Sequence, residues 1–253
     1  MGLKDKIPLF EVYMNPSAKD AVCEVLDSGY IGQGPKVDEF EKQIGDYFGN
    51  KKVITTNAGT SALHLALHLL KKPKPHWNED VFQGVAFVSH NWPGIEDGDE
   101  VLATPLTCTA SNWPIVANNL KIKWVDIDPT TLNMDLEDLE RKMTPKTKAI
   151  MGVHWGGYPL DLDEIRNIRA RFRKEHGWAP ALIEDGAHSI GTKYKGKYLG
   201  NHGNFVMNSL QAIKHITSVD GGLLYCPHDE LYERAKLLRW YGIDRSPKGR
   251  TDF

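Results

Sequence analysis

The sequence has few of the features that are typical of secreted, metal-stabilised or membrane-spanning proteins. Its 253 residues include only three cysteines, Cys23, Cys108 and Cys226, which are few, odd in number and far apart. This spacing excludes a disulfide framework and gives no zinc-ligand pattern. No run approaches the roughly 18 apolar residues of a membrane span. The opening MGLKDKIPLFEVYMNP is charged and has no apolar h-region, so we expect a cytoplasmic protein with no secretory signal.

An excess of positive charge is also missing. Lys and Arg total 31 and Asp and Glu total 33, which leaves a formal net charge of -2. Nucleic-acid binding needs a clustered basic surface, so no nucleic-acid partner is predicted. The sequence has no internal repeat and no long low-complexity segment. With 41% hydrophobic and 25% charged residues, it has the composition of a globular chain with one large core or two modest ones.

Segments that favour strands alternate with segments that favour helices along most of the chain. Short β-branched or apolar runs predict strands, and apolar spacing of three and four residues predicts helices. The expected strands lie within 53–56, 99–105, 121–129, 147–157 and 180–189, with two more around a loop in 205–226. The expected helices lie within 17–29, 37–49, 56–70, 111–120, 135–143, 161–177 and 229–242, and 71–98 is irregular.

This alternation predicts an α/β fold with a mostly parallel central sheet and helices on both faces. Binding residues of such folds collect where the strands end. One such place is Asn57-Ala58-Gly59-Thr60-Ser61, which opens a helix. Small residues allow close approach there, and the unpaired N–H groups of a first turn are a natural phosphate seat. The plainer alternative is that Thr60 caps an ordinary core helix.

Two further strand ends carry ionisable residues. Glu184 and Asp185 end the buried run ALIED, where a carboxylate is costly without a partner. Lys214 lies among small and apolar residues before Gly221-Gly222, a setting in which a lysine can act as an amine nucleophile. Taken separately, the carboxylates are equally well explained as a cap for the next segment, and Lys214 as an ordinary surface lysine. Together they supply the phosphate seat, carboxylate and amine that pyridoxal phosphate requires.

Six stretches together resemble the DegT/DnrJ/EryC1/StrS family of sugar aminotransferases, which are pyridoxal-phosphate enzymes of fold type I. They are SGYIGQGPKVDEFE, TTNAGTSALHLAL, VLATPLTCTAS, the VHWGGYPLDLDEI block, LIEDGAHSIG and NSLQAIKHITSVDGG. They occur in the family's order from about Ile7 to Arg245. The set is therefore far more specific than any single motif.

The resemblance assigns roles to individual residues. Lys214 matches the lysine that forms a Schiff base with pyridoxal phosphate, and Asp185 matches the aspartate that pairs with the pyridine nitrogen. His188 matches the Gln or His near the cofactor's phenolic oxygen. The phosphate would be held by Gly59, Thr60 and Ser209. No metal ligands are implied.

The chain departs from the family pattern at two points. Cys108 stands where the family usually places an aromatic residue stacked on the cofactor ring, and a cysteine offers less π contact. Family members also continue past Arg245 into a smaller C-terminal domain, whereas this chain stops at Phe253. We therefore expect an N-terminal segment and helix over 1–30, a large cofactor-binding domain over 31–253, and a C-terminally truncated product or fragment.

The function implied by the resemblance is transamination from an amino donor, L-glutamate by family analogy, to a keto sugar. The acceptor would be nucleotide-linked and the pathway amino-sugar or polysaccharide biosynthesis, with a homodimer as the complete protein. Three alternatives stay open: a dehydratase of the same family, in which histidine replaces the lysine; a non-catalytic cofactor-binding remnant; and a nucleotide-binding Rossmann protein. The last is disfavoured because the chain has no G-x-G-x-x-G turn.

Overall fold

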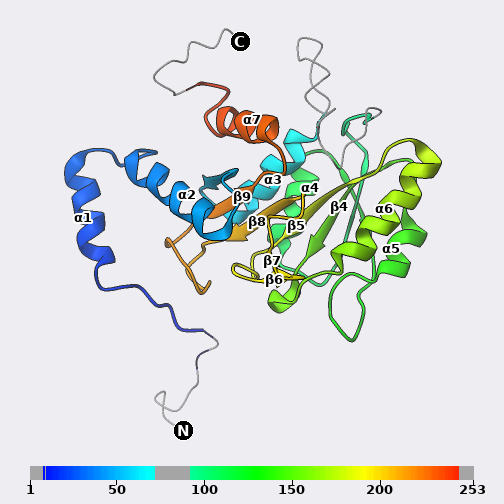
Figure 1. Ribbon diagram of the computed structural model, residues 1–253, viewed down its shortest axis with the longest axis horizontal. Helices are drawn as coiled ribbons and strands as arrows, with labels where there is room; N and C mark the ends of the chain where they lie inside the picture. The colour runs from blue at the N-terminus through cyan, green and yellow to red at the C-terminus, as the bar shows by residue number, and fades with distance from the viewer. Residues whose placement is uncertain (1–7, 9, 72–91, 245–253) are drawn as a thin grey trace.

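The computed structural model describes residues 8, 10–71 and 92–244 (Figure 1). Most of the stretch expected to be irregular, 71–98, lies outside the described residues. The helices are α1 (Ala18–Ser28), α2 (Pro35–Phe48), α3 (Gly59–Leu69), α4 (Thr109–Ala117), α5 (Leu136–Lys142), α6 (Leu162–His176) and α7 (Asp229–Arg239), with a 3₁₀ turn η3 (Trp155–Gly157). The strands are β1 (Val53–Thr56), β2 (Glu100–Ala103), β3 (Lys121–Trp124), β4 (Thr147–Val153), β5 (Ala181–Asp185), β6 (Lys193–Tyr194), β7 (Lys197–Tyr198), β8 (Phe205–Ser209) and β9 (Gly222–Tyr225).

Seven of these strands form one sheet in the order β1-β9-β8-β5-β4-β2-β3. All neighbours from β8 to β3 pair in parallel, and β9 runs antiparallel to both β1 and β8. The mostly parallel sheet predicted from the alternation of elements is therefore confirmed. The pair of strands expected in 205–226 is also present, as β8 and β9. The small β6–β7 hairpin was not predicted, because two-residue strands leave almost no sequence pattern.

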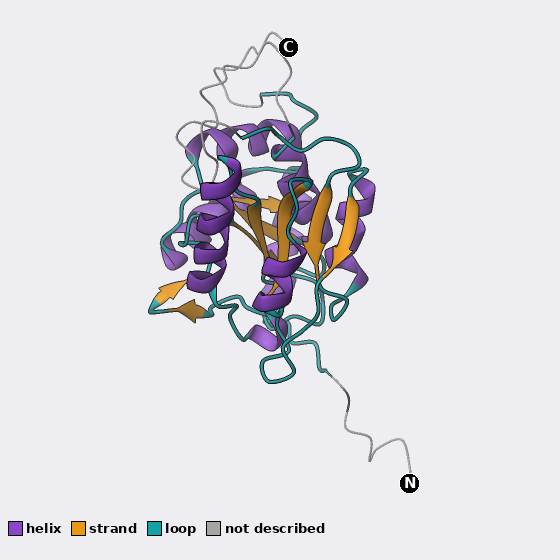
Figure 2. Cartoon of the chain, turned by 90° about the vertical axis from the view of Figure 1, so that its right-hand side faces the viewer, coloured by secondary structure: helices purple, strands orange, loops and turns teal. Residues whose placement is uncertain are grey.

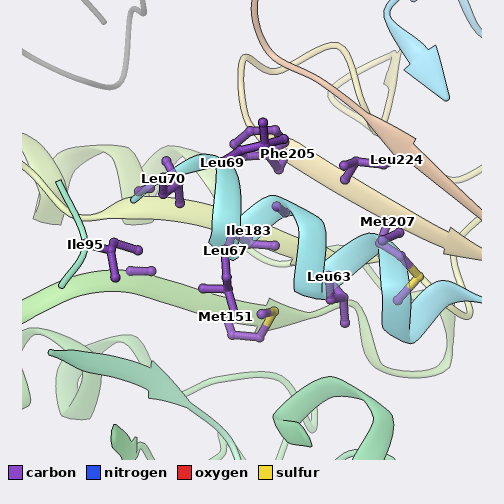
Figure 3. Close-up of a cluster of buried hydrophobic side chains, with 14 of the residues drawn as sticks. Leu63, Leu67, Leu69, Leu70, Ile95, Met151, Ile183, Phe205, Met207 and Leu224 are labelled. Carbon is purple, nitrogen blue, oxygen red and sulfur yellow. The ribbon is translucent and has the colours of Figure 1, made fainter. Parts of the chain in front are cut away.

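Helices cover both faces of the sheet, and each face has its own apolar core (Figure 2). Alternate residues of β5 show the division. Ile183 packs with α3, α4 and α7, whereas Leu182 packs with α2, α5 and α6. Figure 3 shows α3 lying along the first face, with Leu63 and Leu67 directed at the strands. These side chains repeat at helical spacing, so their burial fixes α3 against the middle of the sheet.

Local signals explain several helix boundaries. Gly29, Gly49 and Gly177 adopt left-handed conformations after α1, α2 and α6, as helix-terminating glycines do. Asp161 accepts hydrogen bonds from the first turn of α6. The N-cap residue of α3, which directly precedes the helix, is instead Ala58, whose methyl side chain cannot form a capping hydrogen bond. The alternative in which Thr60 caps this helix is wrong, because Thr60 lies inside the first turn.

The topology brings several chain segments to one edge of the sheet. Strands β1, β2, β4, β5 and β8 run in the same direction, so their carboxyl ends lie at this edge. The antiparallel β9 begins there, since Gly222 is paired with both Thr56 and Ser209. Among the described residues, no helix is long and apolar enough to cross a membrane. The carboxyl edge is where open α/β sheets bind ligands.

Candidate active site

A cavity of about 390 Å³ opens at the carboxyl edge of the sheet. It is lined by every residue that the sequence nominated for a cofactor site: Gly59, Thr60, Cys108, Asp185, His188, Ser209 and Lys214. They come from α3, β5, β8, the residue before α4 and the loops that follow β5 and β8. The structure therefore brings together in one place residues that the sequence singled out in separate motifs.

The first turn of α3 forms one wall of the cavity. The preceding Ala58 makes no side-chain cap, so no side chain of this residue competes for the first N–H groups of the helix. Ser209, at the end of β8, lies against this turn, and a Cβ atom added to Gly59 would stand 3.4 Å from the Ser209 Cβ. A hydroxyl thus adjoins the positive end of a helix, which is a suitable seat for a phosphate.

Two glycines allow this helix to begin so close to the sheet. A Cβ atom at Gly222 would lie 2.6 Å from backbone atoms of Ala58 and Gly59. A Cβ atom at Gly59 would lie 2.8 Å from the sulfur of Met207. Backbone atoms cannot give way as a flexible side chain can. Glycine is therefore required more strictly at position 222 than at position 59 for α3 to begin at this place.

Asp185 lies on the floor of the cavity with its carboxylate held on both sides. The backbone N–H of Ala187 donates to Oδ1 at 3.0 Å, and the hydroxyl of Ser111 donates to Oδ2 at 2.5 Å. The strand end is fixed as well, because the N–H of His154 donates to the Asp185 carbonyl at 3.0 Å. The side chain is 3% exposed. Its acceptor groups are oriented before any ligand arrives.

Lys214 is carried by the loop between β8 and β9. The loop is closed by backbone hydrogen bonds from Leu210 to Gly221 (2.9 Å) and from Ser218 to Leu210 (3.0 Å). Within it, the N–H of Lys214 donates to the Gln211 carbonyl at 2.9 Å. Lys214 is half-buried and lines the cavity, and the neighbouring His215 is exposed and does not. Of these two adjacent residues, the one that faces the cavity is Lys214, the residue that the family resemblance selects.

His188 and Cys108 lie at the rim. The His188 ring meets the edge of the Trp155 ring at a centroid distance of 5.6 Å. Partial burial lowers the pKa of His188, the nearby charge of Lys214 lowers it further, and the charge of Asp185 opposes both. His188 thus responds to the charges of both Lys214 and Asp185. Cys108 is exposed and precedes α4 directly.

The second acidic residue of the motif, Glu184, is directed away from the cavity. It is completely buried on the opposite face of the sheet. His154 Nε2 lies 2.9 Å from Glu184 Oε2, and the amide of Asn204 donates to Oε1 at 2.7 Å. Because the His154 Nδ1 accepts the N–H of Leu160 at 3.0 Å, its proton is on Nε2 and is donated to Glu184. This carboxylate is fully enclosed by structural partners.

The sequence analysis missed three residues that shape the site. Thr107 and Ser111 line the cavity, and Gly222 supports the start of α3. Ser111 had a detectable signal, because α4 buries the stripe Ser111, Pro114 and Ile115 and a serine is the polar member of that stripe. The importance of Gly222 depends on a contact across 163 positions, which no local pattern reveals. No group of three or more metal-ligating side chains occurs in the described part of the chain.

The residues present fit pyridoxal phosphate. An amine, a pre-oriented carboxylate and a helix start without a side-chain cap surround one cavity, and these are the donor and acceptor types that the cofactor needs. The fit rests on this set of groups and on the close approach that Gly59 and Gly222 permit. The ring-stacking position differs, because Cys108 provides no aromatic face.

Comparisons with known proteins identify the family of the chain. The chain matches the DegT/DnrJ/EryC1/StrS aminotransferase family over residues 13–76 and 84–252. It is 33% identical over 225 residues to the spore coat polysaccharide biosynthesis protein SpsC of Bacillus subtilis, covering 89% of this chain and 50% of SpsC. The chain therefore spans about half the length of the curated relatives it matches.

Solved structures show the same fold. AtS13 from Actinomadura melliaura is 51% identical with a TM-score of 0.84, over 96% of this chain and 59% of AtS13. The sugar aminotransferase CalS13 from Micromonospora echinospora is 43% identical with a TM-score of 0.83, over 95% and 59%. The E. coli GDP-4-keto-6-deoxy-D-mannose-3-dehydratase with bound hydrated PLP is 28% identical with a TM-score of 0.76, over 92% and 54%. The fold is that of fold type I PLP-dependent transferases.

Proposed function

The chain belongs to the DegT/DnrJ/EryC1/StrS aminotransferase family, and we propose on this basis that it carries the cofactor site of a pyridoxal-phosphate-dependent sugar aminotransferase. The donor is an amino acid, L-glutamate by family analogy, and the acceptor is a nucleotide-linked keto sugar. The observation that carries the proposal is the single cavity that Lys214, Asp185 and the first turn of α3 line together. The name of SpsC supports a place in polysaccharide biosynthesis.

Pyridoxal phosphate, when bound, supplies an aldehyde that condenses with amines and a protonated ring that draws electrons from the neighbouring bond. Asp185 would pair with the protonated ring nitrogen, because its carboxylate is held by two donors and the residue lines the cavity. The α3 N–H groups and the Ser209 hydroxyl hold the phosphate. His188 lines the same cavity and, by family analogy, would face the phenolic oxygen of the cofactor.

Lys214 has two tasks in this proposal. Its ε-amine anchors the cofactor between turnovers. When an amino donor replaces it, the released Nζ takes the proton from the α-carbon of the donor as a general base and holds it for return as a general acid. The loop hydrogen bonds around Gln211 and Gly221 keep the amine at the cavity wall during both tasks.

The test compares Lys214→Ala with Lys174→Ala, an exposed lysine in the last turn of α6. Each protein is mixed with pyridoxal phosphate, reduced with borohydride and digested. Mass spectrometry is expected to find the cofactor adduct on Lys214 in the wild type and in the control, and none at the site in Lys214→Ala. An adduct spread over surface lysines in all three proteins would refute the assignment.

A dehydratase is the second candidate, since the E. coli dehydratase shares the fold. In that branch a histidine replaces the lysine, and here Lys214 rather than His215 lines the cavity. This placement favours the aminotransferase. Incubation with a nucleotide-linked keto sugar separates the candidates further, because amino transfer places nitrogen on the sugar, whereas a dehydratase removes a hydroxyl group and leaves no nitrogen there.

A non-catalytic cofactor-binding remnant is a third outcome that these experiments distinguish. It would bind pyridoxal phosphate at Lys214 but release no 2-oxoglutarate from glutamate. The division into a segment over 1–30 and a domain over 31–253, the homodimer and the cytoplasmic location stay predictions. Light scattering of the protein tests the dimer directly.

A further inference from the structure

Ser111 occupies an unusual place for a serine. It is 1% exposed, in the first turn of α4, on the stripe with which that helix contacts the sheet. A buried hydroxyl without a hydrogen-bond partner costs free energy, and the Ser111 hydroxyl has two such partners. They are the Asp185 carboxylate, at 2.5 Å from its Oδ2, and the hydroxyl of Thr107, at 2.6 Å.

The chemistry of these groups fixes the direction of both hydrogen bonds. An ionised carboxylate only accepts, so the single proton of Ser111 is donated to Asp185. Ser111 has then no proton left for Thr107, and Thr107 must donate to the oxygen of Ser111. The result is a directed chain from Thr107 through Ser111 to Asp185, in which each bond polarises the next.

The second oxygen of Asp185 is held independently by the N–H of Ala187 at 3.0 Å. With one donor on each oxygen, the plane of the carboxylate is fixed. Thr107, Ser111 and Asp185 all line the same cavity. Hydrogen bonds to a charged group are short and strong, so this arrangement resists rotation of the side chain.

We propose that Ser111, supported by Thr107, is a positioning residue that orients Asp185 toward the ring nitrogen of the cofactor. This inference rests on the proposed function, and it adds to that function the residues that set the carboxylate in place. Ser111 acts through Asp185 rather than on the cofactor itself. Removing the Ser111 hydroxyl should therefore weaken the binding only of those ligands that offer a ring nitrogen to Asp185.

The experiment measures dissociation constants by equilibrium titration for two probes, pyridoxal 5′-phosphate and its 1-deaza analogue, in which carbon replaces the ring nitrogen. The wild type is expected to prefer the natural cofactor. Ser111→Ala should bind it about ten-fold more weakly and bind the deaza analogue as the wild type does, because a hydrogen bond to a charged group is lost. Ser111→Thr, which keeps the hydroxyl, should restore the preference, and Thr107→Val should reduce it less than Ser111→Ala.

Each other outcome has a defined meaning. Unchanged affinity of Ser111→Ala for pyridoxal phosphate would overturn the inference, and so would an equal loss for both probes, which would indicate a direct contact or general damage to the site. Equal affinity of the wild type for both probes would also overturn it. Failure of the wild type to bind pyridoxal phosphate at all would instead refute the proposed function, so the two failures are distinguishable. Circular dichroism of each variant checks that it is folded.

Discussion

Glu184 and Asp185 are neighbours at the end of one strand, yet they lie in two different environments. Alternation along β5 directs Glu184 to the face covered by α5 and α6 and Asp185 to the face with the cavity. Glu184 is enclosed by two donors whose roles are set, the Nε2–H of His154 and the amide of Asn204. Asp185 is held by one backbone N–H, from Ala187, and by one hydroxyl, from Ser111, whose proton can turn.

This difference shows how one strand end can serve both stability and chemistry. A carboxylate whose donors are fixed and shielded from water contributes to the stability of the fold. Removing it leaves those donors without an acceptor. A carboxylate at a cavity wall that is held by a rotatable hydroxyl can exchange that partner for a ligand or for water. The free-energy cost of the exchange is lower than for a fully enclosed carboxylate. Sequence position alone makes the two residues equivalent, so only the sheet geometry distinguishes them.

The largest expected effect separates the two carboxylates by stability. Glu184→Ala leaves two buried donors without an acceptor, at about 1–3 kcal/mol each, so we expect a loss of roughly 2–6 kcal/mol in the free energy of unfolding. Asp185→Ala should cost roughly 1 kcal/mol, because Ser111 and Thr107 can pair with each other and water can reach Ala187 from the cavity. Urea unfolding of both variants measures the difference.

The same pair of variants should behave in the opposite way toward the cofactor. Asp185→Ala is expected to lower amino transfer at least 100-fold, as removal of an oriented electrostatic partner does. Equal stability losses in the two variants would contradict the division into a structural and a functional carboxylate.

The next effect concerns the backbone on the cavity side. Gly222→Ala would place a Cβ atom 2.6 Å from the backbone of Ala58 and Gly59, and overpacking of this kind costs about 1–3 kcal/mol. The start of α3 must move, so affinity for pyridoxal phosphate should fall together with stability. Gly32→Ala is the matched control, because nothing lies within 4 Å of its Cβ position and its φ is not positive. Thermal unfolding and cofactor titration of both variants test this, and a Gly222→Ala protein that binds like the control would show that α3 tolerates displacement.

Much of the fold follows from local patterns in the sequence. The alternation of apolar strands with amphipathic helices predicted the mostly parallel sheet, because burial on both faces requires that pattern. The ends of α6 also have a local explanation, since Asp161 accepts hydrogen bonds from its first turn and Gly177 follows it in a left-handed conformation. The position of β9 as the one reversed strand was not predicted, since strand order depends on contacts between segments far apart.

The site was predictable to the extent that its residues carry their own chemical signal. Lys214, Asp185 and Gly59 each stand in a distinctive motif, and the structure places them around one cavity. Ser111 carries only the signal of a polar residue on an apolar helix stripe, which does not reveal its partner, a carboxylate 74 positions away. Gly222 carries no local signal, because its role depends on the space beside a helix start far away in the sequence. Whether the predicted residues bind a cofactor is decided by the experiments above.

The smallest expected effect concerns the charges that meet inside the cavity. His188 has its pKa lowered from 6.5 by burial and then by the Lys214 charge. The unfolded chain therefore takes up a proton before the folded chain does, and the free energy of unfolding should decrease as the pH falls through about 6.5. Lys214→Met removes one of the two causes, so the pKa of His188 should rise toward its ordinary value and the decrease in stability should become shallower. Proton NMR of the His188 ring in wild type, Lys214→Met and the control Lys174→Met measures this. An identical His188 titration in all three proteins would mean that the charge of the Lys214 amine does not act on His188. A shift in Lys214→Met alone would place that charge beside His188. It would then lie on the face of the sheet that carries Asp185, and not on the face that carries Glu184.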